Sequence, residues 1–190
     1  MDMPDIILIG VALSMDAFAL TIANCAAYRG KLTPLKEWSM PIAFALFQTI
    51  MPIVGFYVGS AVAGYISSAA GYVTATVFFL LALKVVIDNL RKKDPAGETP
   101  PEDFSFGVLT VQAVATSIDA LVIGVTFAAT LTSPFLPALA IGGVTFALVA
   151  AALLFGKYLG ELFGKYAEWF GSAILFILAV KTLVFAIIGK

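Results

Sequence analysis

Long apolar runs constrain the fold of this chain more than any other feature. A helix needs about 20 mostly apolar residues to cross the hydrocarbon core of a bilayer. Of the 190 residues, 61% are hydrophobic and only 12% are charged, whereas soluble domains have about 25% charged residues. The sequence therefore predicts an all-α, polytopic membrane protein. Its six transmembrane helices are expected at roughly 5–27, 39–66, 71–90, 105–131, 136–156 and 169–188.

A polar, proline-rich segment divides the predicted spans into two sets of three. It covers 94–103 and reads as a solvated linker, so the expected units are 1–93, the linker 94–103, and 104–190. Lysine and arginine cluster in the loops on one side of the predicted bundle, eight residues against one, if the intramembrane Lys84 and Lys181 are left out. The positive-inside rule then places these loops and the linker in the cytoplasm and both termini outside. The eight are Arg29, Lys31, Lys36, Arg91, Lys92, Lys93, Lys157 and Lys165, and the one is Lys190.

The two halves share short stretches of sequence at fixed offsets. Residues 14–17 (SMDA) match 117–120 (SIDA) at an offset of 103, and later in each half the offset becomes 97, as for Gly59 with Gly156. Three spans per half is an odd number, so the second half must lie inverted relative to the first. Inverted repeats of this kind place their substrate near the midplane, between the repeats.

Each half carries one aspartate in the middle of an apolar span, Asp16 in the first and Asp119 in the fourth. A charge at that depth costs at least ~3 kcal/mol on insertion scales, so such residues usually mark an ion path. The alternative is that each carboxylate is held by a hydroxyl or a lysine and serves only helix packing. We expect the repeated pair to meet near the midplane and bind a cation.

Oxygen-bearing side chains near these aspartates are the other candidate ligands. Gln48 lies one turn before Pro52, and a proline leaves the carbonyl four residues earlier without its helical partner. The alternative reading of Gln48 is a proline kink stabilised by its neighbours. The predicted metal ligands are Asp16, Asp119, Gln48, Ser14, Thr116 and Ser117, and the accessory candidates are Asn24, Gln112, Thr49, Glu168 and Lys181.

Histidine is absent, and Cys25 is the single cysteine. This composition excludes a disulfide within the chain, a Cys/His metal cluster and histidine-based catalysis. Carboxylate, amide, hydroxyl and carbonyl oxygens suit Mn²⁺, Mg²⁺ or Ca²⁺ rather than zinc or copper. No basic patch is large enough for nucleic acid, and no nucleophile–base pair suggests an enzyme.

Four segments are similar to the MntP-type manganese efflux pumps, small six-helix bacterial exporters related to the LysE-like transporters. They are SMDAFAL at 14–20, FQTIMPIVGF at 47–56, ATSIDALVIGV at 115–125 and GKYAEWFG at 164–171. The resemblance covers nearly the whole chain in the same order. It implies export of Mn²⁺ across the cytoplasmic (inner) membrane of a bacterium, with Asp16 and Asp119 as the central acidic residues.

The expected function is therefore metal/proton antiport, with Mn²⁺ as cargo, no resident cofactor, and protons and membrane lipid as partners. The oligomeric state is left open. Two alternatives compete with it: a LysE-like exporter of amino acids or another small cation, and a non-transporting membrane subunit in which the aspartates serve helix assembly. Metal-induced stabilisation of the purified protein would separate the pump from both.

Overall fold

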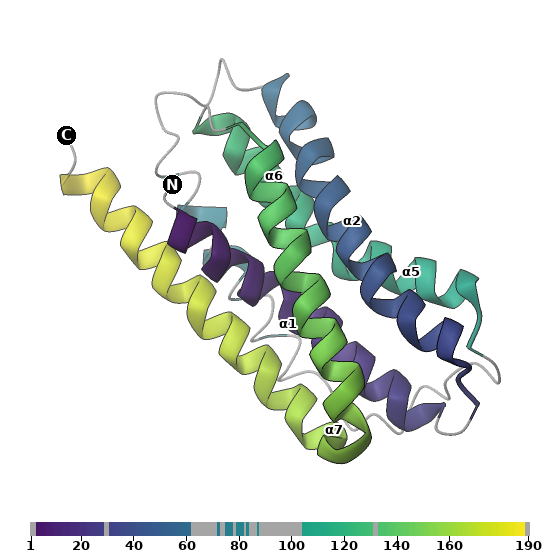
Figure 1. The fold of residues 1–190 in the computed structure, drawn as a ribbon. Coiled ribbons are helices and arrows are strands. Elements are labelled where there is room, and N and C mark those ends of the chain that lie inside the picture. The colour runs from purple at the N-terminus through teal and green to yellow at the C-terminus, as the bar shows by residue number, and fades with distance from the viewer. Residues whose placement is uncertain are drawn as a thin grey trace.

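Helices make up the described part of the chain (Figure 1). The computed structural model describes residues 3–28, 31–61, 104–130 and 133–188, together with nine positions between 72 and 87; side chains over 156–172 and at several later positions lie outside the description. The helices are α1 (Met3–Ala27), α2 (Pro34–Ser60), α5 (Phe106–Thr116), α6 (Ile118–Ala129) and α7 (Phe135–Ile188). The nine positions between 72 and 87 are also helical. The expected linker 94–103 lies outside the described residues.

Helix α2 begins five residues earlier than its apolar run suggests. Thr33 has an extended backbone, and its hydroxyl accepts the Lys36 backbone N–H, while Pro34 takes the first helical position. Both residues are favoured at these positions, because the cap satisfies an unpaired N–H and proline has none to satisfy. The helix then continues through Pro41 and Pro52 to Ser60. Of the two behaviours that a span of this length allows near Pro52, a tilt or a break, the break does not occur within α2.

The fourth predicted span, 105–131, is wrong in one respect, because it consists of two helices. Helix α5 ends at Thr116, and α6 begins at Ile118. Between them Ser117 has φ −102° and ψ 4°, outside the helical region. The pair is a discontinuous helix that breaks near its middle.

The fifth and sixth predicted spans belong to one helical run, α7, without the expected interruption between 156 and 169. A straight helix of this length would place Ile141 and Ala179 roughly 57 Å apart, at 1.5 Å per residue. Both residues nevertheless belong to one buried cluster. Accordingly, Figure 1 shows α7 turning back at its lower end, so that its later part (yellow) runs beside α1.

Two apolar clusters fill the interior, one at each end of the bundle, and each long helix passes from one to the other. We call them the first cluster and the second cluster. The first contains Ile6, Ile9, Ala12, Leu13, Leu81, Ala120, Ile123, Phe127, Ile141 and Ala179. The second contains Ala17, Cys25, Tyr28, Met40, Phe44, Phe104, Leu109, Ala113, Val149 and Leu153.

Along the chain, α1 and the first part of α7 run from the first cluster to the second. The α5–α6 pair runs from the second to the first, as the residue order within each cluster shows. Helix α2 runs in the same direction, from Met40 and Phe44 in the second cluster to Met51 and Phe56, which are partly buried and pack against the first. Helix α1 therefore runs opposite to α5–α6, and α2 runs opposite to the first part of α7. These are the relative directions expected for the corresponding helices of an inverted repeat.

Helices α2 and α6 approach each other closely through glycine. A Cβ added to Gly124 would overlap the Pro52 carbonyl oxygen, and one added to Gly55 would overlap the Leu121 carbonyl oxygen. One turn further along α2, a Cβ on Gly59 would lie 2.9 Å from the Val125 Cα. The small residues of this face let the backbones touch.

The described part of the chain contains four helical stretches long and apolar enough to span a membrane: Met3–Ala27, Pro34–Ser60, Phe106–Ala129 and Phe135–Phe155. Large apolar side chains also cover their outer surfaces, with Val111 69% and Leu139 63% exposed. Exposed apolar surface of this extent marks a membrane-facing or partner-facing protein. The chain is a multi-pass membrane protein.

Candidate functional site

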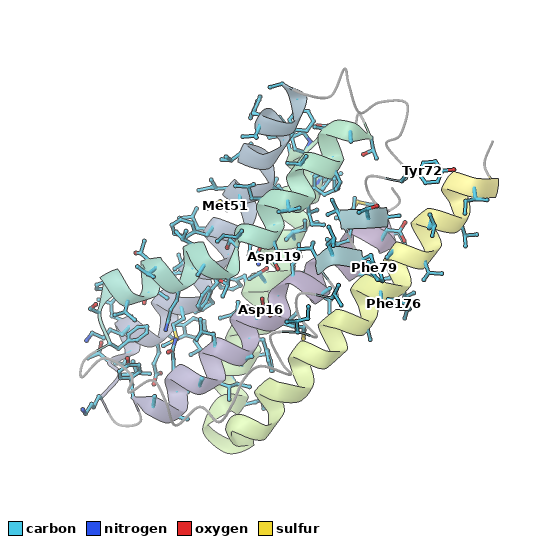
Figure 2. All side chains as sticks on the ribbon, turned by 180° about the vertical axis from the view of Figure 1, so that it is seen from behind. Asp16, Met51, Tyr72, Phe79, Asp119 and Phe176 are labelled. Carbon is cyan, nitrogen blue, oxygen red and sulfur yellow. The ribbon has the colours of Figure 1, made fainter. Side chains whose placement is uncertain are left out.

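A layer of polar side chains separates the two apolar clusters. On α1, α5–α6 and α7 these residues lie between the residues of one cluster and those of the other. On α2, Gln48 lies between Phe44 of the second cluster and Met51, which packs against the first. We call this set the polar layer: Ser14, Asp16, Gln48, Thr116, Ser117, Asp119 and Thr145. Ser14, Gln48, Ser117 and Thr145 have no exposed surface, Asp119 is 8% exposed and Asp16 is half-buried. Figure 2 shows Asp16 and Asp119 in the middle of the bundle.

Gln48 links the backbones that carry the two aspartates. Its Nε2 donates to the Leu13 carbonyl at 3.1 Å and to the Thr116 carbonyl at 3.4 Å. Leu13 is three residues before Asp16, and Thr116 is three residues before Asp119. Leu13 and Thr116 are equivalent positions at the offset of 103 residues, so a single amide ties equivalent positions of α1 and α5 together close to both aspartates.

The break at Ser117 places Asp119 in the first turn of α6. The Asp119 Oδ1 accepts the backbone N–H of Ala120 at 2.8 Å. An N-terminal turn has unpaired N–H groups and a positive dipole end, and both favour a carboxylate. Asp16 lies instead in the interior of the continuous helix α1, so the two aspartates occupy different backbone environments.

Two oxygen atoms of the polar layer have no hydrogen-bond partner among the described residues. They are the Gln48 Oε1 and the Ser117 Oγ, both fully buried. A buried polar atom without a partner costs about 1–3 kcal/mol, and such atoms are rare in folded proteins. Both belong to the part of the layer where Gln48 contacts the Thr116 carbonyl. They are available to a cation, which needs oxygen lone pairs.

The other hydroxyls of the layer, and that of the accessory candidate Thr49, are engaged within the protein. The Ser14 and Thr145 hydroxyl oxygens lie 2.8 Å apart, and Ser14 also donates to the Gly10 carbonyl at 2.5 Å. The Thr116 hydroxyl bonds the Gln112 carbonyl at 3.0 Å. The Thr49 hydroxyl bonds the Ala45 carbonyl at 2.8 Å, and it packs against Gly142 of α7.

Two accessory candidates lie together away from the aspartates. The Asn24 and Gln112 side-chain amides are hydrogen-bonded to each other in both directions, at 2.9 and 3.2 Å. They join α1 to α5 within the second cluster's end of the bundle. Glu168 and Lys181 belong to α7, but their side chains lie outside the described residues.

Thr145 is a polar-layer residue that the sequence did not single out as a ligand. No acidic residue lies near it in the sequence, and its side chain differs from that of Gln48 in size and chemistry. The offset of 97 residues between the two halves does connect them, since it pairs Gln48 with Thr145. That offset was the available signal.

The chemistry of the layer is that of a hard-cation site. Among the described residues, no group of three or more His, Cys, Asp or Glu side chains could hold a metal, so neutral oxygens would have to complete the shell around two carboxylates. A groove of about 350 Å³ lies between α2 and α5, but apolar residues such as Trp38, Ile42 and Leu46 line it and no polar-layer residue does. The polar layer therefore does not open into this groove.

Comparison with known proteins gives one consistent result. The family model described as "Putative manganese efflux pump" (MntP) matches residues 31–183. Similar curated proteins are named "Putative manganese efflux pump MntP". The Methanobrevibacter smithii protein is 34% identical over 94% of this chain and 95% of its own length. The Clostridium botulinum (strain Loch Maree) protein is 32% identical over 97% of this chain and 95% of its own length. The Campylobacter hominis protein is 35% identical over 95% of this chain and 96% of its own length. No solved structure matches. The chain belongs to the MntP family.

Proposed function

We propose that this chain exports Mn²⁺ across the cytoplasmic membrane, and that the ion is held in the polar layer between Asp16 and Asp119. The observation that carries the proposal is the pair of buried oxygens without partners, Gln48 Oε1 and Ser117 Oγ, in the same layer as the two aspartates. With the carboxylates they supply four hard donors. Two carboxylates neutralise the charge of one divalent ion, which lowers the cost of placing it at this depth.

The choice of metal rests on ligand chemistry together with the relatives. Oxygen donors suit Mn²⁺, Mg²⁺ and Ca²⁺, whereas zinc and copper favour imidazole and thiolate. The named relatives are described as manganese efflux pumps. The combination favours Mn²⁺ as the cargo.

Transport is proposed to proceed by alternating access between two inverted halves of three spans each. The opposite directions of α1 and α5–α6 support this arrangement, as does the discontinuous helix at Ser117, since broken helices at the midplane are typical of transporter binding sites. The excess of lysine and arginine in the loops on one side assigns that side to the cytoplasm and both termini to the outside. Apolar clusters lie on both sides of the polar layer, so the ion would be released only after one of them opens.

Proton antiport supplies the driving force in this proposal. Moving a dication outward against an inside-negative potential costs roughly 4.6 kcal/mol at 100 mV, at ~2.3 kcal/mol per charge. If each aspartate takes up a proton as it releases the metal, two protons enter for each ion exported. Such an exchange moves no net charge across the membrane.

Inside-out vesicles test the proposal directly, because export then appears as Mn²⁺ uptake. The chain should take up Mn²⁺ when the vesicle interior is acidified, and uptake should stop when the proton gradient is collapsed. Asp16→Asn and Asp119→Asn should abolish uptake, while Asp5→Asn, outside the polar layer, serves as a matched control. Normal uptake by either midplane variant would refute the site, and uptake indifferent to the gradient would refute the coupling.

A further inference from the structure

We infer that the Asn24–Gln112 pair is the cytoplasmic gate of the transport path, so that its two hydrogen bonds must break before an ion from the cytoplasm reaches the aspartates. The inference rests on the proposed function for its direction of transport. Its structural basis is separate from the metal site. It concerns how α1 and α5 are held together.

Asn24 and Gln112 lie on the same side of the aspartates. Asn24 follows Asp16 by eight residues of continuous helix, roughly 12 Å along the axis. Gln112 precedes Asp119 by seven residues. Arg29 and Lys31 lie in the loop beyond this end of α1, and Lys36 lies in the first turn of α2. This basic cluster identifies the end as cytoplasmic by the positive-inside rule.

Side chains of α1 and α5 fill the space between the amide pair and the aspartates. Ala17 and Ala113 are fully buried there, together with Phe44 of α2. On the other side of the amide pair, the Tyr28 and Phe104 rings meet edge to face, with centroids 5.3 Å apart. The cytoplasmic end is therefore closed by the polar Asn24–Gln112 contact, with apolar side chains packed on both sides of it.

The contact between α1 and α5 can open with little loss of packing among the described residues. Helix α1 packs mainly on α7, and α2 packs on both α6 and α7, whereas α1 and α5 touch only over a short stretch. Along that stretch the amide pair is reciprocal, with each side chain donating to the oxygen of the other. Water or a hydrated cation can replace such bonds when the helices part.

At the opposite end of the bundle, the positions equivalent to the amide pair are apolar. At the offset of 103 residues, the counterparts of Asn24 and Gln112 are Phe127 and Ile9. Both are fully buried in the first cluster. The repeat thus places a polar pair at the cytoplasmic end and apolar side chains at the equivalent positions outside. The side that receives a hydrated ion is the side with amide oxygens, which can substitute for its water ligands.

Cys25 provides a native reporter for the gate. It is the only cysteine of the chain, it is next to Asn24, and it is 7% exposed within the second cluster. Its rate of reaction with a membrane-impermeant, positively charged methanethiosulfonate measures opening. We expect labelling from the cytoplasmic face alone, in inside-out but not right-side-out vesicles, and a rate that changes when Mn²⁺ is added.

Variants of the pair supply the decisive comparison. Asn24→Ala and Gln112→Ala should each raise the Cys25 labelling rate about tenfold, because each removes both hydrogen bonds. The exchanged pair Asn24→Gln with Gln112→Asn keeps two facing amides and should restore slow labelling. Thr110→Ala on α5, whose exposed hydroxyl bonds only the Phe106 carbonyl in the described structure, should leave the rate unchanged.

The outcomes separate the gate from the pump. Wild-type labelling rates in both alanine variants, measured on protein that still elutes as a folded species, would overturn the gate. So would labelling from the outer face. Faster labelling in the alanine variants, with a wild-type rate insensitive to Mn²⁺, would support the gate while refuting manganese as the cargo.

Discussion

The hydroxyl oxygens of Ser14 and Thr145 lie 2.8 Å apart, although the two residues are 131 positions apart in the chain. Their counterparts in the opposite halves, at the offsets of 103 and 97 residues, are Ser117 and Gln48. These counterparts are also fully buried, yet the Ser117 Oγ and the Gln48 Oε1 have no partner among the described residues. One serine–polar pair is therefore closed by a hydrogen bond, while the equivalent pair has both oxygens available to a ligand.

This asymmetry predicts opposite effects for two serine substitutions. Ser14→Ala should lower the free energy of unfolding by about 1 kcal/mol, because it removes the bond to Thr145. Ser117→Ala should leave the stability of the metal-free protein unchanged or slightly higher, because the lost hydroxyl had no partner. Ser117→Ala should instead reduce the stabilisation produced by Mn²⁺. Thermal unfolding in detergent, with and without Mn²⁺, measures both effects, and the reverse pattern would contradict the assignment of Ser117.

Gln48 offers a test that depends on pH. An ionised carboxylate has no donor, so Gln48→Glu should lose both bonds to the Leu13 and Thr116 carbonyls and destabilise the metal-free protein by about 2 kcal/mol. Lowering the pH protonates the new side chain, restores one donor and removes a charge. The stability of the variant relative to the wild type should therefore rise as the pH falls. A stability difference independent of pH, followed by thermal unfolding between pH 8 and pH 5, would show that these bonds do not matter.

The glycines of the α2–α6 contact give a matched pair of substitutions. Gly124→Ala should destabilise the protein by about 1–3 kcal/mol, because its Cβ would overlap the Pro52 carbonyl and force the backbones apart. Gly143→Ala should be neutral or stabilising, because nothing lies within 4 Å of the added Cβ and alanine favours the helix. Unfolding of the two variants in parallel provides the measurement. Equal effects would mean that the close approach at Gly124 is not what holds α2 to α6.

Apolar runs were sufficient to predict the all-helical class and the main spans, because crossing a bilayer requires length and hydrophobicity. Span 5–27 agrees with α1 to within two residues. The start of α2 was missed although Thr33–Pro34 is a recognised helix-start signal, since the prediction followed apolarity alone. The break at Ser117 has no glycine or proline to announce it, and the tertiary contact of Gln48 with the Thr116 carbonyl occurs exclusively in the folded chain. The six-span inverted repeat remains a prediction, because most of 62–103 lies outside the described residues.

The polar layer was only partly predictable for a related reason. Repeated motifs identify Asp16, Asp119, Ser14 and Ser117 from sequence, because matching residues at one offset occupy matching places in a repeat. Sequence could not tell which hydroxyls would be used within the protein, since that depends on helix contacts such as Ser14 with Thr145. The mutual pairing of Asn24 and Gln112 also joins residues 88 positions apart.

The number of Mn²⁺ ions bound by the purified chain tests the central claim most directly. Equilibrium dialysis against Mn²⁺ should give one ion per chain for the wild type and for Asp5→Asn. At the concentration that saturates the wild type, Asp16→Asn and Asp119→Asn should bind none, because one carboxylate no longer balances the charge of a buried dication. One ion per chain at unchanged affinity in both midplane variants would contradict a site shared by Asp16 and Asp119.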